Sequence, residues 1–210
     1  MKHVWRQKEK SIYLPKQNPE IIDLPVMKYF TYSGSGFPAG EEFLDAVKSL
    51  YSMSYGIRML HKSDEVPKGY FEYTVYPLEG EWDLNQKGRD LYESGVLPID
   101  LKGYFEFKMM IRQPSFVDEE LFNKIAMQKS KDPLIKNVVF EEISEGLSCQ
   151  MMHIGSYDDE PESFKIMEEF CTENGYIRTE KRHKEIYISD PRRVEVEKMK
   201  TTIRFKIKKG

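Results

Sequence analysis

The segment from His183 to Tyr187 combines the residue types of an acid–base site with the alternation of a β-strand. Successive strand residues point to opposite faces, so Glu185 and Tyr187 share one face and Ile186 lies on the other. If the isoleucines pack on helices, the Glu185 face looks toward solvent or into a cleft. Enclosure among aromatic groups would raise the pKa of Glu185 and make it a candidate general base. The alternative interpretation is a solvated strand face.

Aromatic residues elsewhere in the chain could form the walls of a pocket. Trp82 follows the turn-like Pro77-Leu78-Glu79-Gly80, where it either closes the edge of a core or lines a pocket. Phe105, Phe107 and Met109 alternate along one predicted strand, as plain core or as the floor of a cavity.

The sequence contains none of the common motifs for phosphate binding, nucleophilic catalysis or metal binding. The sequence has no phosphate-binding glycine loop and no Ser or Cys nucleophile motif. The four histidines lack the spacing of a metal site, and His153 is expected to be a hydrogen-bonded core residue. We therefore expect neither a metal nor a cofactor.

The elements that must position these residues occur twice. A shift of 121 positions places Gly34 on Gly155, Ser35 on Ser156 and Tyr55 on Tyr176. Each copy is predicted to run strand, helix, strand, strand, which gives an α+β fold of duplicated modules with antiparallel sheets. The seam between two such modules is a natural place for a ligand cleft on a pseudo-twofold axis.

The apolar patterns give the expected elements. Helices are predicted over 41–53, 118–129 and 161–173, and strands over 27–32, 70–78, 104–111, 185–189 and 202–207. Strands over 138–143 and 147–154 are predicted to form a hairpin around Glu145-Gly146. We interpret 1–210 as one domain, with a first module over about 20–117, a linking helix over about 118–131 and a second module over about 138–208.

Composition narrows the classes of partner. The 210 residues carry a net charge of −3, which disfavours direct nucleic-acid binding. The sequence shows neither a signal peptide nor a membrane span, and Cys149 and Cys171 lack a redox or metal spacing. These features predict a cytoplasmic protein, monomeric or homodimeric, with no membrane partner.

Several segments together resemble the GyrI-like small-molecule-binding family. They are Pro77-Leu78-Glu79-Gly80 with Trp82, 109–117, 145–150, 153–158 and 183–193. The resemblance implies paired strand-helix-strand-strand modules with a ligand cleft, as in the effector-binding domains of multidrug regulators of the MerR and AraC types. It also implies a small hydrophobic or aromatic ligand bound near Trp82, Phe105, Phe107 and Met109.

Stand-alone members of that family include hydrolases that open the cyclopropane of cyclopropanoid DNA-alkylating agents. The resemblance implies that Glu185 deprotonates or orients a water molecule and that Tyr187 assists it. Lys184 departs from the family pattern, where a second histidine is usual, and Phe105 and Phe107 replace tryptophans. Two alternatives remain open at this point: sequestration of flat or cationic drugs without turnover, and a protein-interaction role of the gyrase-inhibitor type.

Overall fold

The structure is a computed structural model that describes residues 2–38, 40–63, 65–95 and 101–210. The chain forms two compact units. The first contains Met27–Glu142, and the second contains His3–Val26 with Ile143–Gly210. Two long strands, β1 (Glu20–Ser35) and β4 (Val139–Ile154), contribute residues to both units.

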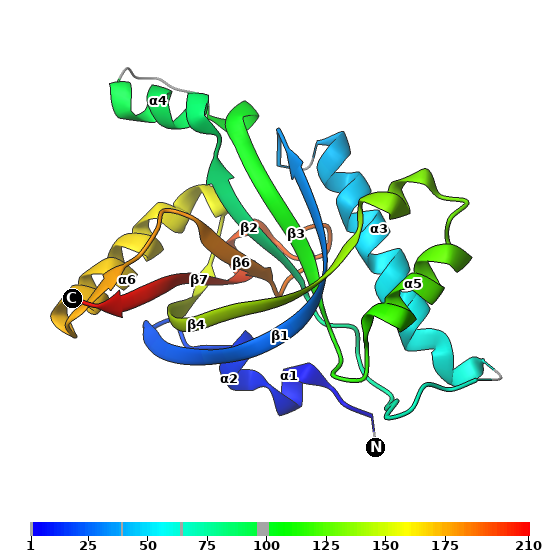
Figure 1. The fold of residues 1–210 in the computed structure, drawn as a ribbon. Helices are drawn as coiled ribbons and strands as arrows, with labels where there is room; N and C mark the ends of the chain where they lie inside the picture. The colour runs from blue at the N-terminus through cyan, green and yellow to red at the C-terminus, as the bar shows by residue number, and fades with distance from the viewer. Residues whose placement is uncertain (1, 39, 64, 96–100) are drawn as a thin grey trace. The chain divides into compact units, whose positions relative to one another are not determined.

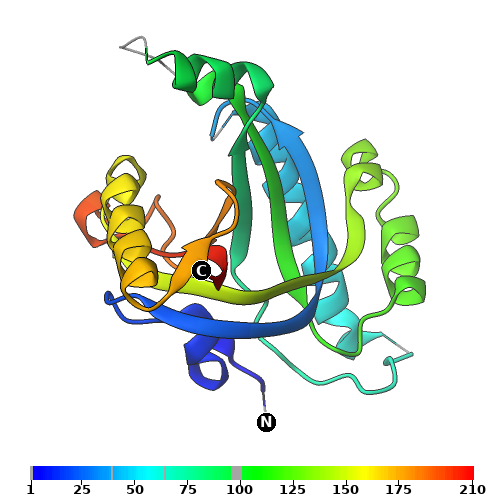
Figure 2. The same cartoon turned by 60° about the vertical axis from the view of Figure 1, so that its left-hand side comes forward.

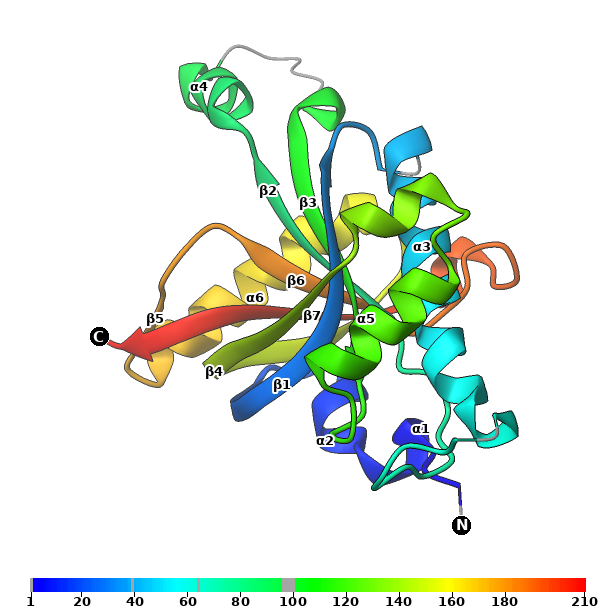
Figure 3. The same cartoon turned by 45° about the vertical axis from the view of Figure 1, so that its right-hand side comes forward.

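The first unit is an antiparallel sheet packed against a helix. The strand order is β1, β3 (Phe105–Gln113) and β2 (Leu78–Leu84), and α3 (Glu41–Arg58) packs on β3. Leu50, Met53 and Ile57 follow helical spacing and are fully buried, so this stripe is what fixes α3 on the sheet. Figures 1 and 3 show α5 (Glu119–Gln128) alongside α3. The unit also contains α4 (Gln86–Ser94) and the short helices η1 (Met59–Lys62), η2 (Lys102–Tyr104) and η3 (Pro133–Asn137).

The second unit repeats this arrangement. Its strand order is β4, β7 (Lys200–Lys209) and β6 (His183–Tyr187), and β5 (Tyr176–Arg178) also pairs with β7. Helix α6 (Glu160–Glu173) lies along one face, where Met167 and Cys171 join a core of residues from β4 and β7. Figure 2 turns this helix toward the viewer. The remaining helices are α1 (Trp5–Lys8), α2 (Lys10–Tyr13), η4 (Tyr157–Asp159) and η5 (Val196–Lys198).

The predicted duplication and the α+β class are therefore confirmed. Each unit has a first strand, a helix, and then two strands of which the last lies in the middle. Gly34 lies near the end of β1 and Gly155 directly after β4, as the 121-residue shift predicts. The cleft between the modules and the single-domain organisation stay predictions.

Two predicted elements are wrong. Residues 70–78 do not form a strand of their own: apart from a single bridge at Tyr73, residues 70–77 lie in a loop, and Leu78 begins β2. Their aromatic side chains instead pack around Phe116, with Tyr70, Phe71 and Tyr73 in ring contact with it. Trp82 accordingly lies inside β2 and not beyond a turn that ends a strand.

The predicted hairpin at Glu145-Gly146 is also absent from the described chain, because β4 runs through both residues without a break. Gly146 has a φ of 62°, a conformation that lets a glycine kink or bulge a strand without reversing it. None of the described helices is both long and apolar enough to cross a bilayer.

Candidate functional site

Strand β6 presents two faces of different chemistry. On one face Lys184 and Ile186 are buried, and Lys184 Nζ lies 2.6 Å from Glu145 Oε1. Arg204 Nη1 on β7 donates to Glu145 Oε2 at 3.0 Å, and Arg204 Nη2 donates to the carbonyl oxygen of Ile12 at 2.6 Å. This face therefore packs on the N-terminal helical segment through a buried ion cluster.

The other face of β6 carries His183, Glu185 and Tyr187, and the α6 side of the unit covers it. The Phe164 ring on α6 lies 4.7 Å from the His183 ring, and the Tyr157 ring on η4 lies 6.0 Å from that of Tyr187. The alternation predicted along the strand is correct. The sequence predicts that Glu185 faces solvent or a cleft if the isoleucine face packs on helices. In the structure the Ile186 face contacts the N-terminal helical segment, and α6 lies on the Glu185 side as well.

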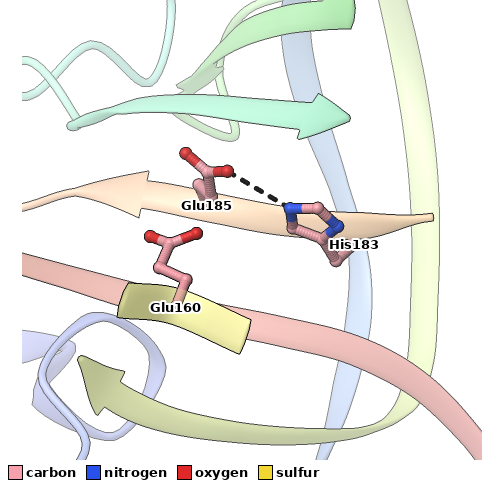
Figure 4. A group of neighbouring side chains, drawn as sticks. All are labelled: Glu160, His183 and Glu185. Atoms are coloured by element: carbon pink, nitrogen blue, oxygen red, sulfur yellow. Dashed lines mark hydrogen bonds and ion pairs between the residues drawn. The ribbon is translucent and has the colours of Figure 1, made fainter. Parts of the chain in front are cut away.

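Glu185 is held between a histidine and a second carboxyl group. His183 Nε2 and Glu185 Oε1 are 3.2 Å apart, and the side chain of Glu160 points to the same place from the first turn of α6 (Figure 4). Glu160 is only 4% exposed, and none of the described residues donates a hydrogen bond to its buried Oε1. Strand β6 supplies His183 and Glu185, which are two residues apart, and the start of α6 supplies Glu160. Three titratable groups thus lie together.

Glu160 is held in its protonated form. Burial raises the pKa of Glu160 to about 10, with further contributions from the negative charge of Glu185 and the hydrogen bond to it. The N-terminus of a helix favours an ionised carboxylate by about 0.3–1 kcal/mol. Removing a carboxylate from water costs several kcal/mol, so burial outweighs the helix contribution here.

Two tyrosines flank the carboxyl pair. Burial raises the pKa of Tyr157 to about 12, and the charges of Glu185 and Glu160 act in the same direction. Tyr157 therefore stays a neutral phenol that can donate a hydrogen bond. Tyr187 lies on the same face of β6 as Glu185, as the sequence predicts. The site offers a carboxylate, hydrogen-bond donors and aromatic surface side by side.

The cluster has donor atoms that a cation could use. His183 Nε2 and one oxygen of each glutamate all lie within 4.8 Å of one another. A metal would require both glutamates to be ionised. Without a cation, the raised pKa of Glu160 favours a carboxyl pair that holds a proton, whereas a bound cation would itself favour the ionised form of both groups.

The other predicted site residues lie in the first unit. Trp82 and Phe107 pack with Phe43 of α3, with ring centroids 6.0 Å and 5.9 Å from it. Trp82 is 5% exposed and Met109 is fully buried, so these side chains form core between β2, β3 and α3. Phe105 packs edge-on against Trp82 and is only half-buried. Of the four predicted wall residues, Phe105 presents the most surface.

His153 is confirmed as a hydrogen-bonded core histidine. Its Nδ1 lies 2.9 Å from Ser163 Oγ, and its Nε2 lies 2.8 Å from the carbonyl oxygen of Ser156. Glu160 and Tyr157 were not singled out from the sequence. They lie in the run Tyr157-Asp158-Asp159-Glu160, which is typical of a solvated helix start.

The comparisons with known proteins agree with this fold and place the chain in a family. Residues 108–208 match the GyrI-like small molecule binding domain. The crystal structure of a hydrolase from Listeria innocua is 32% identical, covers 99% of this chain and 100% of its own, and superimposes with a TM-score of 0.86. An uncharacterized conserved protein from the same organism is also 32% identical, over 98% of this chain and 100% of its own, with a TM-score of 0.86. The chain belongs to the GyrI-like family.

A more distant structure shows the same fold. The EcmrR C-terminal domain is 12% identical, covers 95% of this chain and 99% of its own, and has a TM-score of 0.51. No protein of curated function matches the sequence.

Proposed function

We propose that this protein is a cofactor-free hydrolase of flat, aromatic small molecules, with Glu185 as the general base. The observation that carries the proposal is the position of the Glu185 carboxylate. It is fixed by His183 and flanked by Tyr187 and Tyr157 on a partly enclosed face. Membership of a small-molecule-binding family and 32% identity to a Listeria innocua hydrolase support it.

The proposed substrates are cyclopropanoid DNA-alkylating agents, so that the reaction protects the cell. Glu185 takes a proton from a water molecule, and the water oxygen bonds to a cyclopropane carbon. The strained C–C bond breaks, and its electron pair moves into the conjugated carbonyl, whose oxygen finally receives the proton. The product is the substrate plus one water. Tyr187 orients that water or the Glu185 carboxylate.

We further propose that aromatic side chains hold the polycyclic part of the substrate. Among Trp82, Phe105, Phe107 and Met109, Phe105 is the best placed for contact, because its ring is not fully used in packing. Phe107 and Met109 would support that wall from within the core.

The test is mass spectrometry of a cyclopropanoid agent incubated with the wild-type protein, Glu185→Gln and Glu197→Gln. We expect the wild type to produce the water adduct catalytically and Glu185→Gln to be slower by about 10²–10⁴-fold, the usual contribution of a general base. Glu197 is exposed on η5, so Glu197→Gln controls for the loss of one charge.

Full activity of Glu185→Gln would show that another group is the base. An unchanged compound that copurifies with the wild-type protein would favour sequestration over hydrolysis.

A further inference from the structure

A buried carboxyl group that the proposed mechanism does not use lies beside Glu185. No described residue donates a hydrogen bond to the buried Oε1 of Glu160, and one oxygen of Glu160 lies within 4.8 Å of one oxygen of Glu185. Two ionised carboxylates in such a place repel each other strongly, whereas a single proton between them converts the repulsion into a short hydrogen bond. Figure 4 shows the Glu160 side chain pointing from α6 toward β6, the strand that carries Glu185 and His183.

We propose that Glu160 is a positioning residue: as a carboxylic acid it donates a hydrogen bond to Glu185 and so orients that carboxylate toward the substrate. This inference rests on the proposed role of Glu185 as the base. His183 is the second donor, because its Nε2 lies 3.2 Å from Glu185 Oε1. Two donors from different elements fix the carboxylate plane and leave a lone pair for the reacting water.

The groups around Glu160 are consistent with its acid form. From β6 it faces Glu185 and His183, and from η4 it faces the phenol of Tyr157. His153 of β4 is hydrogen-bonded to Ser163, three residues further along α6 than Glu160, and to the Ser156 carbonyl oxygen. Among these neighbours, Glu185 shares a side-chain hydrogen bond with Glu160.

The first test compares pH profiles of kcat for the wild type, Glu160→Gln, Glu160→Ala and Glu162→Gln. We expect wild-type kcat to fall at alkaline pH as Glu160 ionises, and this fall to disappear in Glu160→Gln, which keeps a donor that cannot ionise. Glu160→Ala should lose about 10–100-fold in kcat, Glu160→Gln clearly less, and KM should change little in both. Glu162 is exposed on the same helical turn, so Glu162→Gln should resemble the wild type.

Equal kcat losses in Glu160→Gln and Glu160→Ala, with the alkaline fall intact, would overturn the positioning role. A second measurement does not depend on turnover: NMR titration of glutamate labelled with ¹³C at Cδ. We expect one carboxyl signal to stay protonated through neutral pH in the wild type and to vanish in Glu160→Gln.

If every glutamate instead titrated near pH 4–5, the hydrogen-bonded pair itself would be overturned, even in an active enzyme. If the NMR signal is present but the wild type turns over no compound, the proposed hydrolase function fails and the positioning role fails with it.

Discussion

Glu160 must make the folded chain less stable at neutral pH than at low pH. At neutral pH its side chain stays protonated in the folded chain, whereas the unfolded chain releases the proton. Its pKa is about 10 in the folded state and close to 4.5 when unfolded. Its contribution to folding is therefore fully present below about pH 4.5 and is lost as the pH rises toward 10.

This direction of the pH dependence gives a prediction for Glu160→Gln, because glutamine cannot ionise. At pH 8 the substitution should raise the free energy of unfolding by on the order of 1–3 kcal/mol, whereas at pH 4 it should change it little. Urea denaturation at pH 4, 6 and 8 measures this dependence, with Glu162→Gln as the control. A stabilisation that is the same at all three pH values would contradict the assignment of the proton to Glu160.

Of this pair of glutamates, only Glu185 is predictable from the sequence. The alternation of His183, Glu185 and Tyr187 places the base on one face of a strand without any knowledge of the tertiary fold. Glu160 follows two aspartates at a helix start, where acidic residues are common because they interact favourably with the helix dipole. Its burial comes from packing of α6 against β6, which local patterns do not contain.

At the scale of elements, a buried ion cluster connects the three main strands of the second unit. Glu145 of β4 contacts Lys184 of β6 and Arg204 of β7, and all three side chains are at most 4% exposed. Burial raises the pKa of Glu145, but the charges of Lys184 and Arg204 outweigh burial and lower it to about 2. The ionised cluster therefore stabilises the fold above about pH 4.5, and this stabilisation is lost as the pH falls toward 2.

We expect Glu145→Gln to cost about 3–5 kcal/mol at pH 7, because it leaves two buried cations without a counter-charge. Glu142→Gln, an exposed position on the same strand, should cost less than about 0.5 kcal/mol. Chemical denaturation at pH 7 and pH 3 measures both variants, and the cost of Glu145→Gln should shrink at pH 3. An equal effect of the two substitutions would show that the cluster contributes no stability.

The elements differ in how far the sequence predicts them. The helices over 41–53 and 161–173 were expected within a few residues of α3 and α6, because their apolar stripes have helical spacing. The strand over 70–78 was wrong because aromatic residues favour strands only where they pack on a sheet. Here they pack around Phe116 from a loop.

At the scale of the whole chain, the duplication preserves topology but not chemistry. Glu185 pairs with Ile203, which pairs with Met151. The first unit has the same series of strand pairings. Leu78 pairs with Ile111, and Ile111 pairs with Phe30. Phe30 is the residue 121 positions before Met151. Leu78 therefore occupies the position of Glu185 in the first module. One copy keeps an apolar core there, and the other carries the acidic site.

The repeated glycines illustrate the same divergence and give a last prediction. Gly155 has a φ of 132°, which a residue with a side chain rarely adopts. At Gly34 the restriction is space: a Cβ there would lie 2.6 Å from Phe107 Cζ. We expect Gly34→Ala and Gly155→Ala each to cost about 1–3 kcal/mol, but for different reasons.

A double-mutant cycle with Phe107→Leu separates the two reasons. Shortening the Phe107 side chain should remove most of the cost of Gly34→Ala, a coupling of about 1 kcal/mol or more. The same background should leave the cost of Gly155→Ala unchanged, because that strain lies in the backbone of Gly155 itself. Urea denaturation of the single and double variants measures both couplings. If Gly34→Ala and Phe107→Leu were additive, packing against Phe107 would not be what requires glycine at position 34. The contact with Glu42 Oε1, 2.9 Å from the same Cβ, would then be the remaining cause.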